Sequence, residues 1–278
     1  MSEPQRWSNI NAAEQTIQVT PSSLCCRATV ASNSPIDDFY EYIASVLPLG
    51  SPDALKENSA LGRVLLLGLV SGTELYFRSI ISGLIRVCPL ARKHASSHQL
   101  TLGAVDYYGM DDLGLGLLES VSMATSGELR SKTEKLTRLK WNQGTSLDSA
   151  VVEFEKLCQF RHAAIHSRGE LGDRNVRELQ VETIGSRLAL SIDFSSLQTA
   201  AAICQNVVRA YNRFMYKATV QRWIDNKTFG TSWKANKNLF TPLFQLFYSQ
   251  RDGLKPENAY LAYRSIAPTI RASLILGP

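Results

Sequence analysis

The sequence predicts a mainly α-helical protein, because apolar residues recur at helical spacing through most of its length. The longest such segment is apolar almost all round between residues 64 and 85, which is typical of a helix buried at the centre of a domain. Proline and glycine stand where these segments begin or end, as at Pro35, Gly50 and Pro89. A clear alternation of apolar and polar residues occurs between about 179 and 192. We therefore expect a helical bundle with one short β-hairpin.

The composition fits a water-soluble protein of one large or two modest domains. The chain has 278 residues and a formal net charge of +5, which permits binding to nucleic acid without requiring it. Its cysteines are odd in number and form no Cys-x-x-Cys pair, as expected for reduced thiols; they are Cys25, Cys26, Cys88, Cys158 and Cys204. The first residues are polar, and the apolar run 64–70 is too short to cross a bilayer. We expect a cytoplasmic protein with no membrane association.

The first third of the chain divides into an arm and two helices. Residues 1–33 are rich in Ser, Thr, Asn and Gln, and we expect them to form an N-terminal arm. Ser34 and Pro35 then supply an N-cap and a favourable first helical residue, and apolar residues at helical spacing follow. A long helix from about 53 to 87 should form the buried centre of a helical domain that spans residues 34–226.

Residues 90–145 form an insertion in this domain. Two stretches of the insertion have helical patterns, near 111–123 and 128–140. The second stretch has a basic face, which is either solvated or a contact surface for RNA. Its residues are Arg130, Lys132, Lys135, Arg138 and Lys140.

The next helix begins at Ser146, which we expect to be its N-cap. The spacing predicts a core face formed by Leu147, Val151, Phe154, Cys158 and Ile165. After a polar turn, residues 179–184 and 187–192 alternate apolar and polar side chains around Gly185 and Ser186, which predicts the short β-hairpin.

A further helix is expected from 196 to 226, with one apolar and one basic face. Its inward residues should be Leu197, Ala201, Cys204, Val208, Tyr211 and Met215. Arg209, Arg213 and Lys217 recur every four residues on the opposite side, where they are either solvated or guide RNA. Residues 227–278 are dense in aromatic side chains, so we expect a C-terminal extension that packs on the core or on a partner.

The strongest indication of function is a pair of residues near the end of the helix that begins at 146. Arg161 and His166 lie five residues apart, just before Ser167, Arg168 and Gly169. Arginine matches the oxygens of a phosphate, and histidine can exchange a proton near neutral pH. In an ideal helix, residues five apart differ by about 140° around the axis. The pair can therefore meet on one phosphate only if the helix unwinds after His166, or if a second copy brings a facing pair.

The run from Arg161 to His166, with His162 following the arginine, resembles the Arg-x4-His motif of HEPN (higher eukaryotes and prokaryotes nucleotide-binding) domains. The segment 65–78, which contains Glu74 followed by Tyr76 and Phe77, is similar to the first core helix of HEPN proteins found in prokaryotic defence loci. The resemblance extends over roughly residues 60–215 and implies an all-helical bundle. Many proteins of this family are metal-independent endoribonucleases of toxin, antiviral and RNA-processing systems.

The resemblance implies roles for particular residues. Arg161 would hold the phosphate, His166 would act as general base or acid, and His162 would position a reacting group. RNA would be cleaved by its own 2′-hydroxyl, which leaves a 2′,3′-cyclic phosphate, in a homodimer with a composite site. We expect no cofactor and no metal, and we expect further substrate contacts from Arg168, Arg209, Arg213 and Lys217. A regulatory protein encoded nearby is a second expected partner. Arg168 stands where HEPN toxins controlled by tyrosine modification have their tyrosine, so that mode of control is not supported.

Two alternatives stay open at this point. A HEPN-like fold can serve as a non-catalytic nucleotide-binding, RNA-binding or scaffolding partner in a defence complex, with Arg161 and His166 binding an anion. His162 and His166 also have the spacing of helical metal ligands, which His94 and His98 repeat. A zinc protease motif would need glutamate where this chain has Ala163, and no third ligand lies at a diagnostic spacing.

Overall fold

The computed structural model describes residues 11–12, 15–28, 33–182, 186–255 and 258–275. The chain forms two compact units, Met1–Ser32 and Asn33–Pro278, each of which is described by itself. The described residues of the first unit are exposed, and they contain one short 3-10 turn, η1 (Pro21–Leu24). All the α-helices described here belong to the second unit, which agrees with the prediction of a mainly helical protein.

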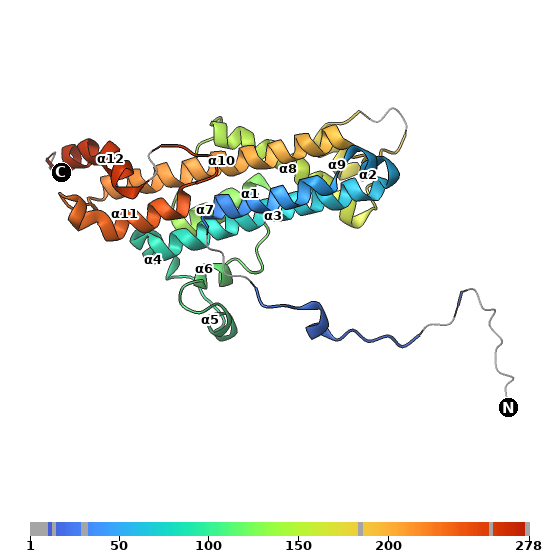
Figure 1. Ribbon diagram of the computed structural model, residues 1–278, viewed down its shortest axis with the longest axis horizontal. Helices are drawn as coiled ribbons and strands as arrows, with labels where there is room; N and C mark the ends of the chain where they lie inside the picture. Colours follow the sequence, from blue (N-terminus) through green and yellow to red (C-terminus); the bar gives the residue numbers. More distant parts are fainter. Residues whose placement is uncertain (1–10, 13–14, 29–32, 183–185, 256–257, 276–278) are drawn as a thin grey trace. The chain divides into compact units, whose positions relative to one another are not determined.

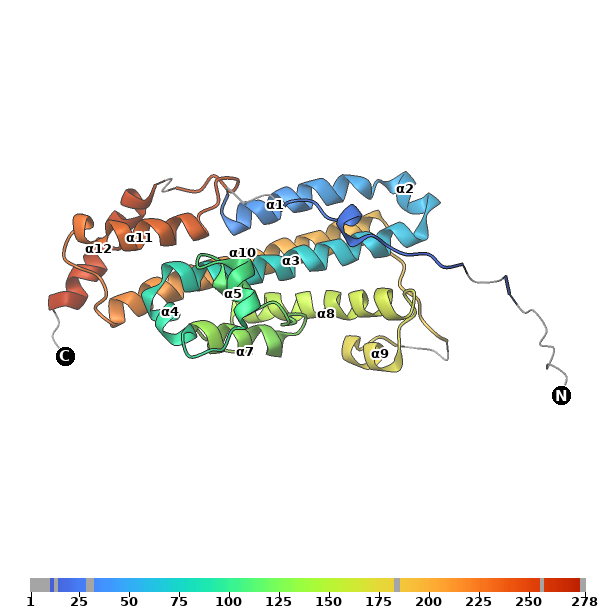
Figure 2. The ribbon, with the colours of Figure 1, turned by 90° about the horizontal axis from the view of Figure 1, so that it is seen from below.

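Four long helices run side by side through the second unit: α1 (Pro35–Val46), α3 (Ser59–Val87), α8 (Ser146–His166) and α10 (Phe194–Asp225) (Figures 1 and 2). The central helix α3 packs against the other three, and α8 also packs against α10. The inward residues of α3, such as Leu66, Leu69 and Leu84, are fully buried. Burial of these apolar faces accounts for the assembly of the bundle.

The predicted helix from 53 to 87 is divided into two helices. α2 (Pro52–Glu57) ends at Asn58, which adopts an extended conformation and caps α3 by accepting a hydrogen bond from the Ala60 N–H at 3.0 Å. α3 then continues to Val87, as predicted from Pro89. Among the described helices, α3 alone is long and apolar enough to span a membrane; the buried core helix of a soluble protein meets the same criteria.

The insertion contains four short helices: α4 (Pro89–Ala95), α5 (Leu102–Tyr108), α6 (Leu113–Gly116) and α7 (Ser126–Thr137). The predicted helix near 111–123 is therefore wrong for most of its length, because only α6 is helical there. The second predicted helix ends at Thr137 and not at 140. Arg138 follows with a φ of 60°, a left-handed conformation that ends a helix.

The predicted β-hairpin at 179–192 is not confirmed. Leu179 ends a helix, α9 (Asp173–Leu179), and the predicted turn lies partly outside the described residues. The second half of the predicted hairpin pairs instead with residues 169–171 through an isolated antiparallel bridge between Glu170 and Ala189. Alternation of apolar and polar residues indicates an extended segment, but it does not identify the segment that pairs with it.

The C-terminal segment forms α11 (Trp233–Phe247) and α12 (Ala259–Ile275), and it belongs to the same compact unit as the bundle. α11 packs on α3 and α12 (Figure 2). Gly83 makes the contact between α3 and α11 possible, because a Cβ atom at this position would lie 2.3 Å from the Leu246 side chain. Phe240 is fully buried, and Trp233 and Tyr263 pack around it.

Candidate functional site

The helix α8 carries the residues of the predicted motif. Its N-cap is Thr145, one residue before the predicted Ser146, and the Thr145 hydroxyl accepts a hydrogen bond from the Asp148 N–H at 3.3 Å. Four of the five predicted core residues, Leu147, Val151, Phe154 and Cys158, are buried. Ile165 is 48% exposed, so its predicted place in the core is wrong. Ile165 lies in the last turn of α8, where Ala163 is the residue that faces the core.

Arg161 faces α3. Its Nη2 atom lies 3.9 Å from Oε2 of Glu74, whose side chain is only 11% exposed. The other oxygen of Glu74, Oε1, accepts a hydrogen bond from the Met123 N–H at 3.4 Å. Because the arginine–glutamate contact is long, the guanidinium is attracted to the carboxylate without a fixed bidentate geometry. Arg161 therefore keeps donors that a further anion can use.

Arg161 and Glu74 line a hollow of about 320 Å³ between α3, α8 and the segment before α7. Arg78 of α3 contributes a second cation to the hollow, and Glu119 and Ser122 complete much of its polar lining. Arg78 is held in place because its Nη2 donates a hydrogen bond of 2.7 Å to the Val121 carbonyl. The hollow therefore combines two arginines with two carboxylates, and two serines also line it.

His162 and His166 lie on the exposed side of α8. Their ring centroids are only 4.4 Å apart because residues four apart lie on one helix face, and the rings are tilted by 47° to each other. Two adjacent, exposed imidazoles can act as a general acid and a general base on one substrate.

The structure leaves Arg161 and His166 on different faces of α8. The helix is regular through His166 and ends at Ser167, so the two residues are about 140° apart around its axis. No hydrogen bond or ion pair joins their side chains in the described part of the chain. The unwinding that would bring both residues to one phosphate within a single chain is therefore not observed.

Arg168 and Gly169 reverse the chain after α8. Their φ angles are 52° and 96°, and the Gly169 N–H donates a hydrogen bond of 3.0 Å to the Ala163 carbonyl. A side chain at position 169 would lie 2.7 Å from Cδ of Arg63, so glycine is favoured there by both backbone and space. The Arg168 side chain is exposed, two residues beyond His166.

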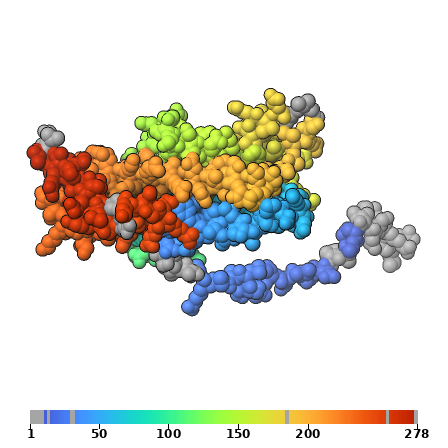
Figure 3. Space-filling view, turned by 45° about the horizontal axis from the view of Figure 1, so that its top comes forward, coloured from blue at the N-terminus to red at the C-terminus, as the bar shows by residue number. Residues whose placement is uncertain are grey.

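Three of the predicted substrate contacts lie on α10, whose outer face is visible in Figure 3. Arg209, Arg213 and Lys217 are all exposed, as the spacing predicted, and the opposite face from Leu197 to Met215 is buried. They lie on a different helix from the α8 motif, and no contact in the described residues brings them to Arg161 or His166.

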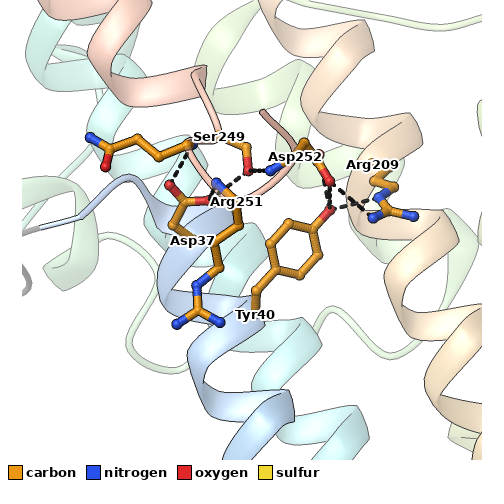
Figure 4. A network of polar contacts seen from close by, with 7 residues as sticks. Asp37, Tyr40, Arg209, Ser249, Arg251 and Asp252 are labelled. Carbon is orange, nitrogen blue, oxygen red and sulfur yellow. Dashed lines mark hydrogen bonds and ion pairs between the residues drawn. The ribbon is translucent and has the colours of Figure 1, made fainter. Parts of the chain in front are cut away.

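Arg209 belongs to a polar network that ties α1 and α10 to the loop after α11 (Figure 4). Its Nε donates a hydrogen bond of 2.6 Å to the Tyr40 hydroxyl, and its Nη2 lies 3.0 Å from Oδ1 of Asp252. Its guanidinium also lies over the Tyr40 ring at 5.3 Å. Burial raises the pKa of Tyr40 to about 12, so the hydroxyl stays protonated. Arg209 therefore has a structural role that its spacing did not reveal.

Glu74, Arg78 and Glu119 were not singled out from the sequence as site residues. Glu74 and Arg78 are the only charged residues between positions 64 and 85 of α3, and because they are four residues apart their side chains lie on one side of the helix. Charged side chains in a buried helix need oppositely charged or hydrogen-bonding partners, and this requirement could have identified Glu74 and Arg78 as candidate site residues. Glu119 lies in the insertion, where no local pattern placed it beside α3.

Cys158 lies one turn before Arg161, on the buried side of α8. Burial raises the pKa of its thiol well above the ordinary value, and the nearby Glu74 carboxylate acts in the same direction. Because only the thiolate is a strong nucleophile, Cys158 serves packing at this position and not covalent catalysis.

His94 and His98 have a ring-centroid separation of 6.0 Å and lie on another part of the molecule, at the end of α4. His94 Nε2 lies 2.6 Å from the Lys135 carbonyl oxygen, and the Nε of Arg138 donates to His94 Nδ1 at 3.2 Å. Both nitrogens of His94 are therefore engaged by protein groups. The described residues contain no cluster of three or more His, Cys, Asp and Glu side chains that could hold a metal ion.

No protein-family model, no curated protein and no solved structure matches this chain. The resemblance to HEPN domains therefore depends on the residues of this sequence alone.

Proposed function

We propose that the protein is a metal-independent endoribonuclease of a toxin or antiviral-defence type, with Arg161 and His166 at its active site. The positions of the arginine and histidine side chains on α8 support this proposal. Arg161 lines a polar hollow against Glu74, and the adjacent imidazoles of His162 and His166 lie exposed at the end of the same helix. An arginine and two accessible imidazoles supply the groups that phosphodiester cleavage needs without a metal.

The reaction follows from the chemistry of these groups. His166, in its neutral form, removes the proton of the ribose 2′-hydroxyl, and the 2′-oxygen attacks the adjacent phosphorus. The bond from phosphorus to the 5′-oxygen breaks, and protonated His162 donates a proton to the leaving oxygen. The products are a 2′,3′-cyclic phosphate and a 5′-hydroxyl. Proton transfer by a positioned side chain contributes about 10²–10⁴-fold to the rate, and Arg161 stabilises the charge that develops on the phosphate oxygens.

The angle between Arg161 and His166 favours a site formed by two copies of the chain. A regular α8 cannot direct both side chains to one phosphate, whereas an antiparallel pair of α8 helices can bring Arg161 of one copy to His166 of the other. Exposed apolar side chains support such contact: Leu75, next to Glu74 on α3, is 60% exposed, and Ile165, one turn after Arg161, is 48% exposed. Burial of these side chains between copies would favour a homodimer.

RNA is the proposed substrate, and the cytoplasm is the proposed location. Arg168 is the nearest additional cation to the imidazole pair along the chain, and it is exposed. Arg213 and Lys217 on α10 are exposed and remain proposed contacts for a longer RNA. Arg209 is a weaker candidate, because Tyr40 and Asp252 already engage it. A regulatory protein encoded nearby is a further proposed partner.

The experiment that tests this proposal is cleavage of total RNA in the presence of EDTA. Wild-type protein should cut and leave cyclic-phosphate ends, and Arg161→Ala and His166→Ala should each lose the activity. Arg177→Ala is a matched control, because Arg177 is an exposed arginine of α9 in a surface ion pair with Asp173. Cleavage that requires a divalent metal, or that persists in both site variants, would contradict the proposal.

The alternative function is a HEPN-like module that binds RNA or a nucleotide without cleaving it. The separation of Arg161 and His166 on α8 favours this alternative if the chain acts as a monomer. A binding module would retain affinity for RNA and would leave RNA intact at every protein concentration.

A further inference from the structure

A basic cleft lies between α4 and α7, which run next to each other in the insertion (Figure 2). Its volume is about 640 Å³, and it shares no lining residue with the hollow at Arg161. Its basic side chains are His94, His98, Arg130, Lys135 and Arg138, and Glu134 is its single acidic one. An excess of donors over carboxylates in one concave surface favours an anionic ligand.

The cleft is organised by contacts between its own residues. Arg138 ends α7 in a left-handed conformation, and its Nε donates a hydrogen bond of 3.2 Å to Nδ1 of His94. Since Nδ1 accepts this bond, the ring hydrogen lies on Nε2, which donates to the Lys135 carbonyl at 2.6 Å. These bonds orient the guanidinium of Arg138 before any ligand binds, which reduces the entropy lost on binding.

Two cations of the cleft have no acidic partner among the described residues. Arg130 forms an ion pair with Asp148 at the start of α8, and it lies over the Trp141 ring at 5.1 Å. Its charge therefore serves the packing of α7 on α8. Lys135 and Arg138 form no ion pair in the described part of the chain, and both are exposed at the cleft. The terminal nitrogens of Arg138 and the ammonium of Lys135 are suited to phosphate oxygens.

We propose that the cleft between α4 and α7 binds the phosphate backbone of RNA through Lys135 and Arg138. The identity of the polyanion as RNA rests on the proposed function. The lining residues of α7 extend from Gly127 to Lys135, about 12 Å along the helix, which exceeds the size of one phosphate, and Arg138 follows directly after the helix. No Phe, Tyr or Trp lines the cleft, and its basic side chains outnumber its two imidazole rings, so contacts to the backbone are favoured over stacking of bases. Contacts to the backbone position a strand without reading its sequence.

The test is binding of a fluorescein-labelled single-stranded RNA to the full chain, followed by fluorescence anisotropy. The test variant is the double substitution Lys135→Gln/Arg138→Gln. Each phosphate contact to a single strand contributes a slope of about −0.7 to log K against log salt, so two contacts account for about −1.4. At 0.1 M salt the double variant should bind about 25-fold more weakly, and its salt slope should be smaller by about 1.4.

The matched control is Lys234→Gln/Lys237→Gln. These two lysines are exposed on α11, have the same spacing, and lie outside the cleft. The control removes the same charge, so it reports the effect of net charge alone. Lys135→Gln by itself is the second variant, since the Lys135 side chain forms no ion pair with the residues that the structure describes, and its affinity should fall about 5-fold. Circular dichroism of each variant confirms that the fold is retained.

Three results would overturn this inference. They are an unchanged affinity in the cleft variant, an equal loss in the α11 control, and binding to phosphatidylserine vesicles that depends on the cleft in the absence of RNA binding. Failure of the cleft is distinguishable from failure of the nuclease. Arg161→Ala should abolish cleavage and, as the loss of a single phosphate contact, should lower the affinity for RNA by no more than about 5-fold. RNA bound at the cleft but never cut would contradict the nuclease alone.

Discussion

Asp37 joins α1 to the loop after α11. Removal of the Asp37 carboxylate should therefore lower the free energy of unfolding by a measurable amount. Asp37 is 4% exposed in the first turn of α1. Its carboxylate accepts hydrogen bonds from the Ser249 hydroxyl at 2.6 Å and from the backbone N–H groups of Gln250 at 2.8 Å and Arg251 at 3.4 Å (Figure 4). These bonds hold a loop that is more than two hundred residues away in the chain.

The expected loss in the free energy of unfolding follows from the two shorter hydrogen bonds of Asp37, which come from Ser249 and Gln250. A hydrogen bond to a charged group contributes about 1.5–3 kcal/mol, and the bond of 3.4 Å adds little. With the lower value for each short bond, Asp37→Ala should reduce the free energy of unfolding by about 3 kcal/mol. The Ser249 hydroxyl retains one role after the substitution, because it also accepts a bond from the Asp252 N–H at 3.0 Å.

The measurement is urea unfolding followed by circular dichroism at neutral pH. Asp38→Ala is the matched control, because Asp38 occupies the next position of α1 and forms no hydrogen bond or ion pair with the described residues of the loop. Burial raises the pKa of the Asp38 carboxyl, so it gains little from its position, and the control should change stability by less than about 1 kcal/mol. An equal effect of the two substitutions would refute the assignment of Asp37 as the anchor of this loop.

Three further results are expected. Phe240→Ala should lower the free energy of unfolding by about 3–5 kcal/mol in the same urea assay, because the ring is fully buried; a loss below 1 kcal/mol would contradict its place in the core. Asp193, the N-cap of α10, has a lowered pKa because it accepts hydrogen bonds from Ser196. Its stabilisation relative to Asp193→Asn should be complete above pH 3.8, the ordinary value, and should disappear as the pH falls through the lowered pKa; unfolding midpoints across this range measure it. In a thiol assay of the native protein, Cys25 and Cys26 should react rapidly and the three buried cysteines should react only after denaturation.

The helices were predictable where a long apolar pattern repeats with one period. α3 and α10 follow from such patterns, and the buried residues of α10 were identified correctly. The break before α3 was missed because Asn58 interrupts no apolar stripe, although asparagine is a preferred N-cap residue. The pairing of residues 187–190 with 169–171 was missed because alternation carries no information on the partner.

The candidate site was predictable in part. The sequence identified Arg161, His162 and His166, and helical geometry gave the angle between them. It could not show that Arg161 faces Glu74, because that contact depends on how α8 packs on α3. The contacts of Arg209 were not predicted for the same reason: its partners lie 169 and 43 residues away. Charged residues with distant partners are the ones for which spacing alone is a poor guide.

The composite site is the central claim, and mixed dimers test it most directly. Arg161→Ala and His166→Ala chains, co-expressed with different tags, form heterodimers in which one site keeps Arg161 of one copy and His166 of the other. Random pairing makes half of the dimers mixed, each with one intact site, so the mixture should recover about a quarter of the wild-type cleavage rate. No recovery in isolated heterodimers, with wild-type protein active in the same assay, would contradict a site shared between two copies.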